Sequence, residues 1–294
     1  MRIGYFADGV WGQRALALLA QEKSLEIAFV VLRQRRPDNK LAAMAARLNI
    51  EVLSVPDVNS PSFMTQLEDF DCDILVSMSF DQIFHAPLIS SSPRGILNCH
   101  AGQLPWYRGR NVLNWVLINN EPSFGVTAHY IDEGIDTGDI ILQRTYSISD
   151  ADNYATLLDR AGTYCAEVLL DAILQVSSGK DKRVPQASID PNGFYCSERR
   201  PGDERLNWSQ TSRQVFGFVR ALSDPGPGAI TFFEGTPITI ENVQLLSGVK
   251  SHGGFPGAIV GVDNTSFLVK TLDTCVRVNH WYGDFTPRIG VRFT

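Results

Sequence analysis

Residues 2–32, RIGYFADGVWGQRALALLAQEKSLEIAFVVL, contain a strand, a helix and a second strand in quick succession. Residues 2–6 and 26–32 are rich in β-branched and aromatic side chains, which is typical of strands, and helical spacing of apolar residues predicts a helix over 11–21. The alternation continues with helices at 40–48 and 62–70 and strands at 50–54, 73–78 and 95–99. It predicts an α/β fold with a mostly parallel, Rossmann-like sheet and helices on both faces.

The second half of the chain changes pattern. We expect a helix near 110–119, strands at 125–131 and 139–146, and a long amphipathic helix with apolar residues between 157 and 173, capped by Asp152 and stopped by Gly179. The polar segment 179–207 contains several Pro and Gly and predicts a connection. A helix at 209–222 and short strands between turns then predict a small, OB-like β-barrel. We therefore expect a first domain over 1–190, a linker over 191–208 and a barrel domain over 209–294.

Composition narrows the function classes. The chain has 294 residues with 44% hydrophobic and 20% charged residues, which is ordinary for a folded protein and excludes a disordered or fibrous one. A net charge of −6 argues against general electrostatic binding of nucleic acid. The five cysteines are scattered singly, so they predict neither a zinc site nor a disulfide scaffold. Since no apolar run approaches the roughly 20 residues of a membrane span, we expect a soluble cytoplasmic protein.

Several common catalytic motifs are missing. The first strand–helix junction, residues 8–12 (DGVWG), lacks the G-x-G-x-x-G spacing of a dinucleotide site. There is also no Walker A sequence, no G-x-S-x-G and no H-E-x-x-H. These absences weaken the NTPase, serine hydrolase and zinc protease hypotheses.

The informative stretch is residues 98–115, NCHAGQLPWYRGRNVLNW. Asn98 and His100 alternate at the end of a predicted strand, so their side chains should leave the same face at the carboxyl edge of the sheet. The loop that follows carries Trp106, Tyr107, Arg108 and Arg110, which are suited to stacking on a ring or binding an anion. The alternative is that His100 is an ordinary loop histidine and that the aromatic side chains cover a hydrophobic edge.

This stretch resembles the N-x-H and L-P-x-Y-R-G signature of the 10-formyltetrahydrofolate-dependent formyltransferases. Their catalytic aspartate follows the histidine by about 36 residues, which here is Asp136 in DEGIDTGDI (132–140). Segments 199–208 (RRPGDERLNW) and 220–229 (RALSDPGPGA) extend the resemblance to nearly the whole chain, toward aminoarabinose-type sugar formyltransferases and methionyl-tRNA formyltransferases. One departure is Ala101-Gly102-Gln103, where the family usually has Gly-Ser-Leu.

The resemblance implies roles for individual residues. His100 would deprotonate the attacking amine, Asn98 would stabilise the oxyanion and Asp136 would orient His100. It also implies N10-formyltetrahydrofolate as donor, released as tetrahydrofolate, and no metal. Two loops would hold the pterin, and their residues are Phe80, Gln82, Ile83, Phe84, Asp132, Glu133 and Gly134. Without the resemblance, the residues favour a turn role for Asp136 over a catalytic one, and they leave core packing and folate binding equally open for Phe80, Ile83 and Phe84.

The acceptor predicted by the resemblance is a nucleotide-linked amino sugar used for surface polysaccharide or lipopolysaccharide. Segment 33–40, RQRRPDNK, lacks the basic insertion typical of methionyl-tRNA formyltransferases, and residues 200–294 hold nine Lys and Arg against eight Asp and Glu. Candidate substrate contacts are Asp8, Gly9, Trp11, Trp106, Tyr107, Arg108, Arg110, Arg199 and Arg200. We expect a homodimer without nucleic-acid or membrane partners. The alternatives are a methionyl-tRNA formyltransferase and a non-catalytic folate- or sugar-binding module.

Overall fold

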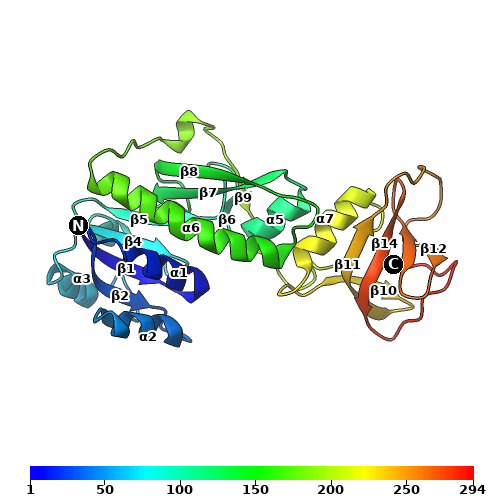
Figure 1. The fold of residues 1–294 in the computed structure, drawn as a ribbon, viewed down its shortest axis with the longest axis horizontal. Coiled ribbons are helices and arrows are strands. Elements are labelled where there is room, and N and C mark those ends of the chain that lie inside the picture. Colours follow the sequence, from blue (N-terminus) through cyan, green and yellow to red (C-terminus); the bar gives the residue numbers. More distant parts are fainter. The chain divides into compact units, whose positions relative to one another are not determined.

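The computed structural model describes every residue from Met1 to Thr294, and Figure 1 shows its helices and strands. The strands are β1 (Arg2–Ala7), β2 (Glu26–Leu32), β3 (Glu51–Ser54), β4 (Ile74–Met78), β5 (Ile96–His100), β6 (Arg108–Gly109), β7 (Ser123–Tyr130), β8 (Ile140–Ser147), β9 (Tyr195–Cys196), β10 (Ala229–Phe233), β11 (Thr236–Leu245), β12 (Ile259–Val262), β13 (Phe267–Lys270) and β14 (Cys275–Tyr282). The helices are α1 (Gly9–Leu19), α2 (Asn39–Arg47), α3 (Pro61–Glu68), α4 (Ala86–Ile89), α5 (Val112–Ile118), α6 (Tyr154–Ser177), the short 3-10 helix η1 (Gln186–Ser188) and α7 (Ser212–Leu222).

The larger sheet has seven strands in the order β3-β2-β1-β4-β5-β7-β8. Strands β1 to β5 pair in parallel, whereas β7 runs antiparallel to β5. The chain moves outward from β1 to β3 and then returns to β4 on the other side of β1, so the order reverses between β1 and β4. Ligands of such sheets bind near this reversal, outside the carboxyl ends of the strands. The mostly parallel sheet expected from the sequence is confirmed.

Helices cover both faces of this sheet because neighbouring residues of β1 point to opposite sides. On one face, the Tyr5 hydroxyl donates to the carbonyl of Gly12 in α1 at 3.0 Å, and α6 lies beside α1 (Figure 1). On the other face, the Phe6 ring packs edge-on against Phe63 of α3 within a cluster that also takes in β2, β3 and α4. The predicted covering of both faces is therefore confirmed.

The C-terminal strands form an antiparallel sheet in the order β10-β11-β14-β13-β12. One face of α7 packs onto this sheet through Val215, Val219 and Leu222, which belong to a core shared with the strands. A reciprocal capping box between Thr211 and Gln214 starts α7. The arrangement is consistent with the small barrel predicted from the strand and turn pattern.

Two compact units make up the chain, and both are discontinuous in sequence. The first unit comprises Met1–Gly109, Gly125–Tyr146 and Asp159–Tyr195, and the second comprises Arg110–Phe124, Ser147–Leu158 and Cys196–Thr294. Within the second unit α5 packs against α7, where Asn114 Nδ2 donates to the carbonyl of Ala221 at 2.6 Å. The helix after the arginine-rich loop is thus built into the same unit as the barrel.

The N-terminus of α6 is capped by Asn153, so the prediction of Asp152 is wrong by one residue. Asn153 Oδ1 accepts the N–H of Thr156 at 3.0 Å, and Thr156 Oγ1 accepts the N–H of Asn153 at 2.9 Å. Asp152 instead accepts the N–H of Ser149 at 2.7 Å and closes the preceding turn. Local sequence cannot separate two adjacent good N-cap residues. Gly179, at φ +65°, ends the helical segment as expected.

Candidate active site

The candidate catalytic side chains meet where β5 ends at the carboxyl edge of the sheet. Asn98 and His100 alternate with the buried Cys99 along β5, so both leave the same face. Strand pairing places Asn98 directly opposite His129 of β7. Asp136 comes from the loop between β7 and β8. The structure therefore brings the three predicted residues together and adds His129, which the sequence analysis missed.

His129 is buried and contacts the Asn98 carboxamide. Its Nδ1 lies 2.7 Å from the carbonyl oxygen of Tyr130, which assigns the ring proton to Nδ1 and leaves Nε2 as an acceptor. That Nε2 lies 3.3 Å from Asn98 Nδ2. Burial lowers the pKa of His129, although the charge of Asp136 opposes the shift. A neutral His129 thus accepts one amide N–H of Asn98 and leaves the second free.

Both ring nitrogens of His100 face oxygen atoms. Nε2 lies 2.7 Å from the carbonyl oxygen of Tyr107, and Nδ1 lies 3.6 Å from Asp136 Oδ2. The doubly protonated ring satisfies both oxygens, whereas a neutral ring satisfies one of them. Gly102 provides the space, because a Cβ there would come within 2.5 Å of His100 Nε2 and 2.4 Å of the Tyr107 oxygen. The glycine in Ala101-Gly102-Gln103 is therefore required by the position of His100.

Asp136 lies between the two histidines in a left-handed backbone conformation, with φ at +54°. Its Oδ2 accepts the N–H of Gly109 at 2.8 Å, and its Oδ1 lies 3.6 Å from His129 Nε2. Burial by itself would raise the pKa of Asp136. His100, His129, the Gly109 N–H and the charge of Arg108 outweigh burial and hold that pKa below its ordinary value. The carboxylate is therefore ionised at neutral pH.

A pocket of about 190 Å³ opens beside this cluster. Its lining includes Asn98 and Asp136 together with six of the seven residues predicted to bind folate, namely Phe80, Gln82, Ile83, Phe84, Asp132 and Gly134. Ser77, His129, Ile131 and Ile135 complete the lining. Glu133 and His100 are not among the lining residues. The two loops named from the sequence therefore meet around one cavity next to Asn98 and Asp136.

Phe80 and Phe84 belong to the pocket and to the core. Their rings are stacked with centroids 5.9 Å apart, and both contact Phe6 in the cluster under the sheet. Ile83, in contrast, is 64% exposed. The carboxamide of Gln82 accepts the N–H of Val58 at 3.0 Å. The two phenylalanines thus pack in the core and also line the pocket, so their contact with folate stays a prediction, while Ile83 has no core role.

The loop before α5 uses its large side chains within the first unit. Trp106 Nε1 donates to Asp190 Oδ2 at 2.9 Å, and the Tyr107 ring is buried against a neighbouring aromatic ring. Arg108 is 8% exposed and donates through Nε and Nη2 to Gln186 Oε1 at 3.0 and 2.7 Å. The guanidinium of Arg108 is therefore already hydrogen-bonded to a side chain of the protein, the Gln186 carboxamide.

Three candidate substrate residues follow the end of β1. Asp8 forms an ion pair with Arg33, which also lies 3.4 Å from Asp81. Burial raises the pKa of Asp8, although Arg33 opposes this shift. Gly9 begins α1 at φ +67° with open space around its Cα, and Trp11 lies against α6. The ion pairs with Arg33 therefore fix the carboxylates of Asp8 and Asp81.

The three remaining arginines are in the second unit. Arg110 is exposed and pairs with Glu198 at 2.9 Å. The backbone N–H of Arg199 donates to Asn111 Oδ1 at 3.0 Å, and burial lowers the pKa of the Arg199 side chain. Arg200 is exposed and has no ion pair. Of these three, Arg199 is the one held inside the unit.

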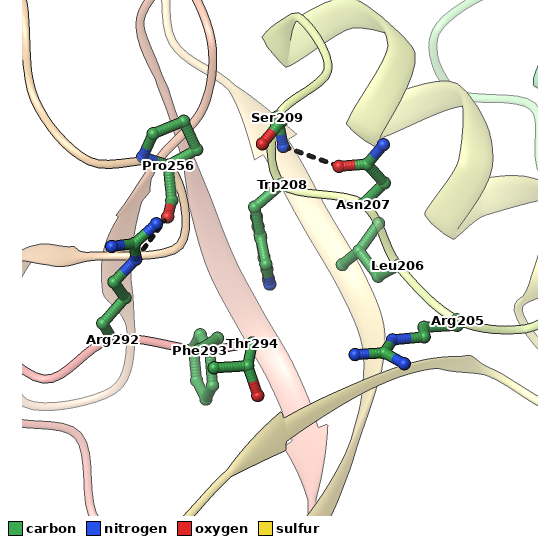
Figure 2. Close-up of a pocket in the computed structure, with 9 residues that line it drawn as sticks. All are labelled: Arg205, Leu206, Asn207, Trp208, Ser209, Pro256, Arg292, Phe293 and Thr294. Carbon is green, nitrogen blue, oxygen red and sulfur yellow. Dashed lines mark hydrogen bonds between the residues drawn. The ribbon is translucent and has the colours of Figure 1, made fainter.

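A larger hollow of about 400 Å³ lies within the C-terminal unit, and Figure 2 shows Arg205 and Arg292 on opposite sides of it. Its lining consists of Arg205, Leu206, Asn207, Trp208, Ser209, Pro256, Arg292, Phe293 and Thr294. The polar groups partly satisfy one another, since Arg292 Nε donates to the Pro256 carbonyl and Asn207 Oδ1 accepts the Ser209 N–H. No predicted site residue lines this hollow.

The remaining chemical features of the chain are few. All five cysteines are free thiols, and four of them are buried. No group of three or more His, Cys, Asp or Glu side chains is arranged to hold a metal ion. None of the helices has both the length and the apolar character needed to cross a bilayer.

Comparison with known proteins places this geometry in context. Residues 1–173 match the Formyl transferase family and residues 199–281 match the Formyl transferase, C-terminal domain. The chain is 30% identical over 300 residues to the methionyl-tRNA formyltransferase of Ruminiclostridium cellulolyticum, covering 99% of this chain and 95% of that protein.

Solved structures share the fold at low identity. An N-formyltransferase from Helicobacter canadensis, in complex with folinic acid and dTDP-3-aminofucose, has a TM-score of 0.72 at 18% identity, covering 95% of this chain and 99% of that chain. HypX from Aquifex aeolicus has a TM-score of 0.62 at 21% identity and covers 96% of this chain, which spans 45% of the HypX chain. With both formyl transferase domains matched in order and a full-length relative at 30% identity, the chain belongs to the formyl transferase family.

Proposed function

We propose that this protein transfers a formyl group from N10-formyltetrahydrofolate to the amino group of a nucleotide-linked amino sugar, in the cytoplasm, for surface polysaccharide or lipopolysaccharide. The observation that carries the proposal is the cluster of Asn98, His100 and Asp136 beside the 190 Å³ pocket. A binding module needs no such set of proton acceptor, amide donor and buried carboxylate. The cluster therefore favours an enzyme.

The pocket suits a bicyclic donor ring. Phe80, Ile83 and Phe84 supply an apolar wall, and Asp132 and Gly134 line the same pocket. The Asp132 carboxylate accepts hydrogen bonds from the Gly134 N–H at 3.1 Å and from the Thr137 hydroxyl at 2.5 Å. These bonds stabilise the conformation of loop 132–137. Flat heterocycles need apolar contact on their faces and hydrogen bonds at their edges. When bound, the donor supplies a formyl group attached to nitrogen.

Asn98 is the donor that would stabilise the developing oxyanion. His129 Nε2 accepts one of its two amide N–H groups, which fixes the carboxamide and leaves the other N–H free in a residue that lines the pocket. Such a fixed donor is worth about 3 kcal/mol in comparable acyl-transfer sites. The neutral state of His129 matters here, because a protonated Nε2 could not accept from Asn98.

His100 is the group that would take the proton of the attacking amine. The protonated ring can donate Nε2–H to the Tyr107 carbonyl and direct Nδ1–H toward Asp136. Both oxygens therefore stabilise the state that proton transfer creates. The same imidazolium can then return a proton to the departing nitrogen. Asp136 stays ionised throughout because its pKa is lowered.

The charges near the second strand favour a small acceptor over tRNA. Segment 33–40 is where methionyl-tRNA formyltransferases carry their basic insertion, and its first arginine, Arg33, is neutralised by Asp8 and Asp81. An arginine that pairs with two carboxylates is a poor ligand for an RNA phosphate. Helicobacter canadensis N-formyltransferase, which shares the fold, was solved with a nucleotide-linked amino sugar.

Methionyl-tRNA is the second candidate acceptor, because the full-length relative at 30% identity is a methionyl-tRNA formyltransferase. The test is an acceptor panel with N10-formyltetrahydrofolate as donor: UDP-, dTDP- and GDP-linked amino sugars, and charged initiator tRNA. We expect mass spectrometry to detect formylation of an amino sugar, and His100→Asn to lower turnover at least about a hundredfold. Formylation of tRNA without any sugar would contradict the proposed acceptor. Absence of transfer to every amine would contradict the proposed activity.

A further inference from the structure

Gln186, the first residue of η1, lies fifty residues after Asp136 and is 3% exposed. Its carboxamide makes four hydrogen bonds, two to Arg108 and two to the segment that carries Asp136. We propose that Gln186 and Arg108 form a clamp that positions the Asp136 carboxylate between the two histidines. Gln186 is thus a positioning residue for formyl transfer, and the inference rests on the proposed function.

The oxygen of the carboxamide holds Arg108. Gln186 Oε1 accepts from Arg108 Nε at 3.0 Å and from Nη2 at 2.7 Å. Arg108 has no carboxylate ion pair, and its guanidinium lies 5.5 Å from the Tyr195 ring centroid. A neutral amide binds the guanidinium without cancelling its charge. The positive charge therefore still acts on Asp136, where it helps to hold the pKa of the carboxyl low.

The nitrogen of the carboxamide holds the loop after β7. Gln186 Nε2 donates to the carbonyl oxygens of Asp136 and Gly138, both at 2.8 Å. Asp136 has φ at +54°, a region that costs energy for residues other than glycine and persists only when neighbouring groups hold it. Gly138 is equally constrained, since a Cβ there would come within 1.9 Å of the Tyr130 carbonyl oxygen. The donor pair of Gln186 is what holds this segment from the η1 side.

The Asp136 carboxylate is also held by the segment that carries Arg108. Asp136 Oδ2 accepts the N–H of Gly109, the residue next to Arg108. One side chain therefore ties together three segments, 104–109, 136–138 and 184–188, that contact one another around Asp136. In this arrangement Arg108 acts within the protein, through Asp136, and leaves the recognition of substrate phosphate to other arginines.

Glutamine is the side chain that meets both demands. Glutamate would still accept from Arg108 but would face the carbonyl oxygens of Asp136 and Gly138 without a proton to donate. Methionine, which is similar in length, would lose both halves of the clamp. The two substitutions therefore separate the acceptor function from the donor function.

The experiment compares Gln186→Met and Gln186→Glu with Gln143→Met as matched control. Gln143 is another partly buried glutamine of the same unit, and its Nε2 donates to the Leu104 carbonyl and to Thr127 Oγ1, both at 2.8 Å. It makes no hydrogen bond to Asp136. The control therefore loses two hydrogen bonds, as many as the donor half of the Gln186 carboxamide makes, and none of them is to Arg108, Asp136 or Gly138.

Formyl transfer to the acceptor found in the panel is measured across pH, with thermal unfolding in parallel. We expect kcat to fall at least about tenfold in both Gln186 variants, because small displacements of a catalytic group are costly. The acid limb of the pH profile, where kcat falls as the pH decreases, should move to higher pH because the pKa of Asp136 rises. The move should be larger in Gln186→Glu, where a negative charge is added near Asp136. The control should lose stability but keep the wild-type acid limb.

An unchanged acid limb in both Gln186 variants, with kcat within about twofold of Gln143→Met, would overturn the clamp. If Gln186→Met does not fold, Gln186→Glu carries the test, since it retains the bonds to Arg108. Failure of the proposed function is separate, because it appears as absence of transfer by the wild-type protein itself.

Discussion

Replacement of Gly102 by alanine tests whether the loop after β5 sets the position of His100. The added Cβ would lie 2.4 Å from the Tyr107 carbonyl oxygen and 2.5 Å from His100 Nε2. Ordinary contacts of this kind are about 3.5 Å, so these two groups must move apart from the new methyl by about 1 Å. The 2.7 Å contact between His100 Nε2 and the Tyr107 oxygen cannot survive that movement.

The expected effect is larger on activity than on folding. Overpacking of this size costs about 1–3 kcal/mol of unfolding free energy, whereas displacing a catalytic group by about 1 Å can lower turnover by about a hundredfold. The assay is single-turnover formyl transfer, combined with urea unfolding monitored by tryptophan fluorescence. We expect turnover to fall between about tenfold and a hundredfold in a protein that still unfolds cooperatively.

Gly253→Ala is the matched control, because nothing lies within 4 Å of its added Cβ and its φ is accessible to alanine. It should keep wild-type turnover and stability. A second check adds Gly102→Ala to His100→Asn, where no imidazole remains to be displaced, so turnover should fall no further. Turnover of Gly102→Ala within about twofold of wild type would refute the reasoning, since the clash would then be absorbed without moving His100.

Three further predictions concern Asn98, Asp136 and His129. Asn98→Ala should lower kcat by about 100- to 1,000-fold and the unfolding free energy by only about 1 kcal/mol; turnover near wild type would exclude it as oxyanion donor. The lowered pKa of Asp136 stabilises the fold above the ordinary aspartate value of about 3.9, and this stabilisation is lost as pH falls through the lower folded value. The stability difference between wild type and Asp136→Asn, measured by urea unfolding, should therefore shrink at acid pH, and a constant difference would contradict the charge assignment. Because burial lowers the pKa of His129, the fold has its full stability above the ordinary histidine pKa of about 6.5, where His129 is neutral in both the folded and the unfolded protein. The unfolding free energy decreases as pH falls through that value. The stability of His129→Gln should fall less than that of wild type between about pH 8 and pH 5; equal slopes would argue for a charged His129.

Local patterns were sufficient for most of the fold and for part of the site. The run of apolar residues in β4 and the alternation in β5 report burial directly, so the mostly parallel sheet and the shared face of Asn98 and His100 could be predicted. The two loops around the 190 Å³ pocket were named through the family resemblance. Residues whose role follows from strand position or from a sequence signature are thus accessible without a structure.

Residues whose role depends on distant partners were not accessible. His129 lies in a strand of buried residues and faces Asn98 only because β7 pairs antiparallel with β5 in one particular register. Nothing in the strand itself sets that register; a lone histidine among apolar residues was the only local signal. Arg108 looked like an anion ligand because its partner, Gln186, lies 78 residues further along the chain. Long-range pairing, rather than residue type, decides both cases.

The two histidines of the site differ because Asn98 donates to one ring nitrogen of His129, whereas both ring nitrogens of His100 face oxygen acceptors and can therefore donate. His129 donates through Nδ1 to a backbone carbonyl, and Asn98 takes its other nitrogen, so burial keeps it neutral. His100 has oxygen atoms at both nitrogens and shares the single negative charge of Asp136. The buried carboxylate therefore balances one imidazolium, and that imidazolium is the form of His100 produced when an amine gives up its proton. A site with this charge balance stabilises the protonated form of His100. We therefore expect Asp136→Asn to lower turnover in addition to its pH-dependent effect on the unfolding free energy.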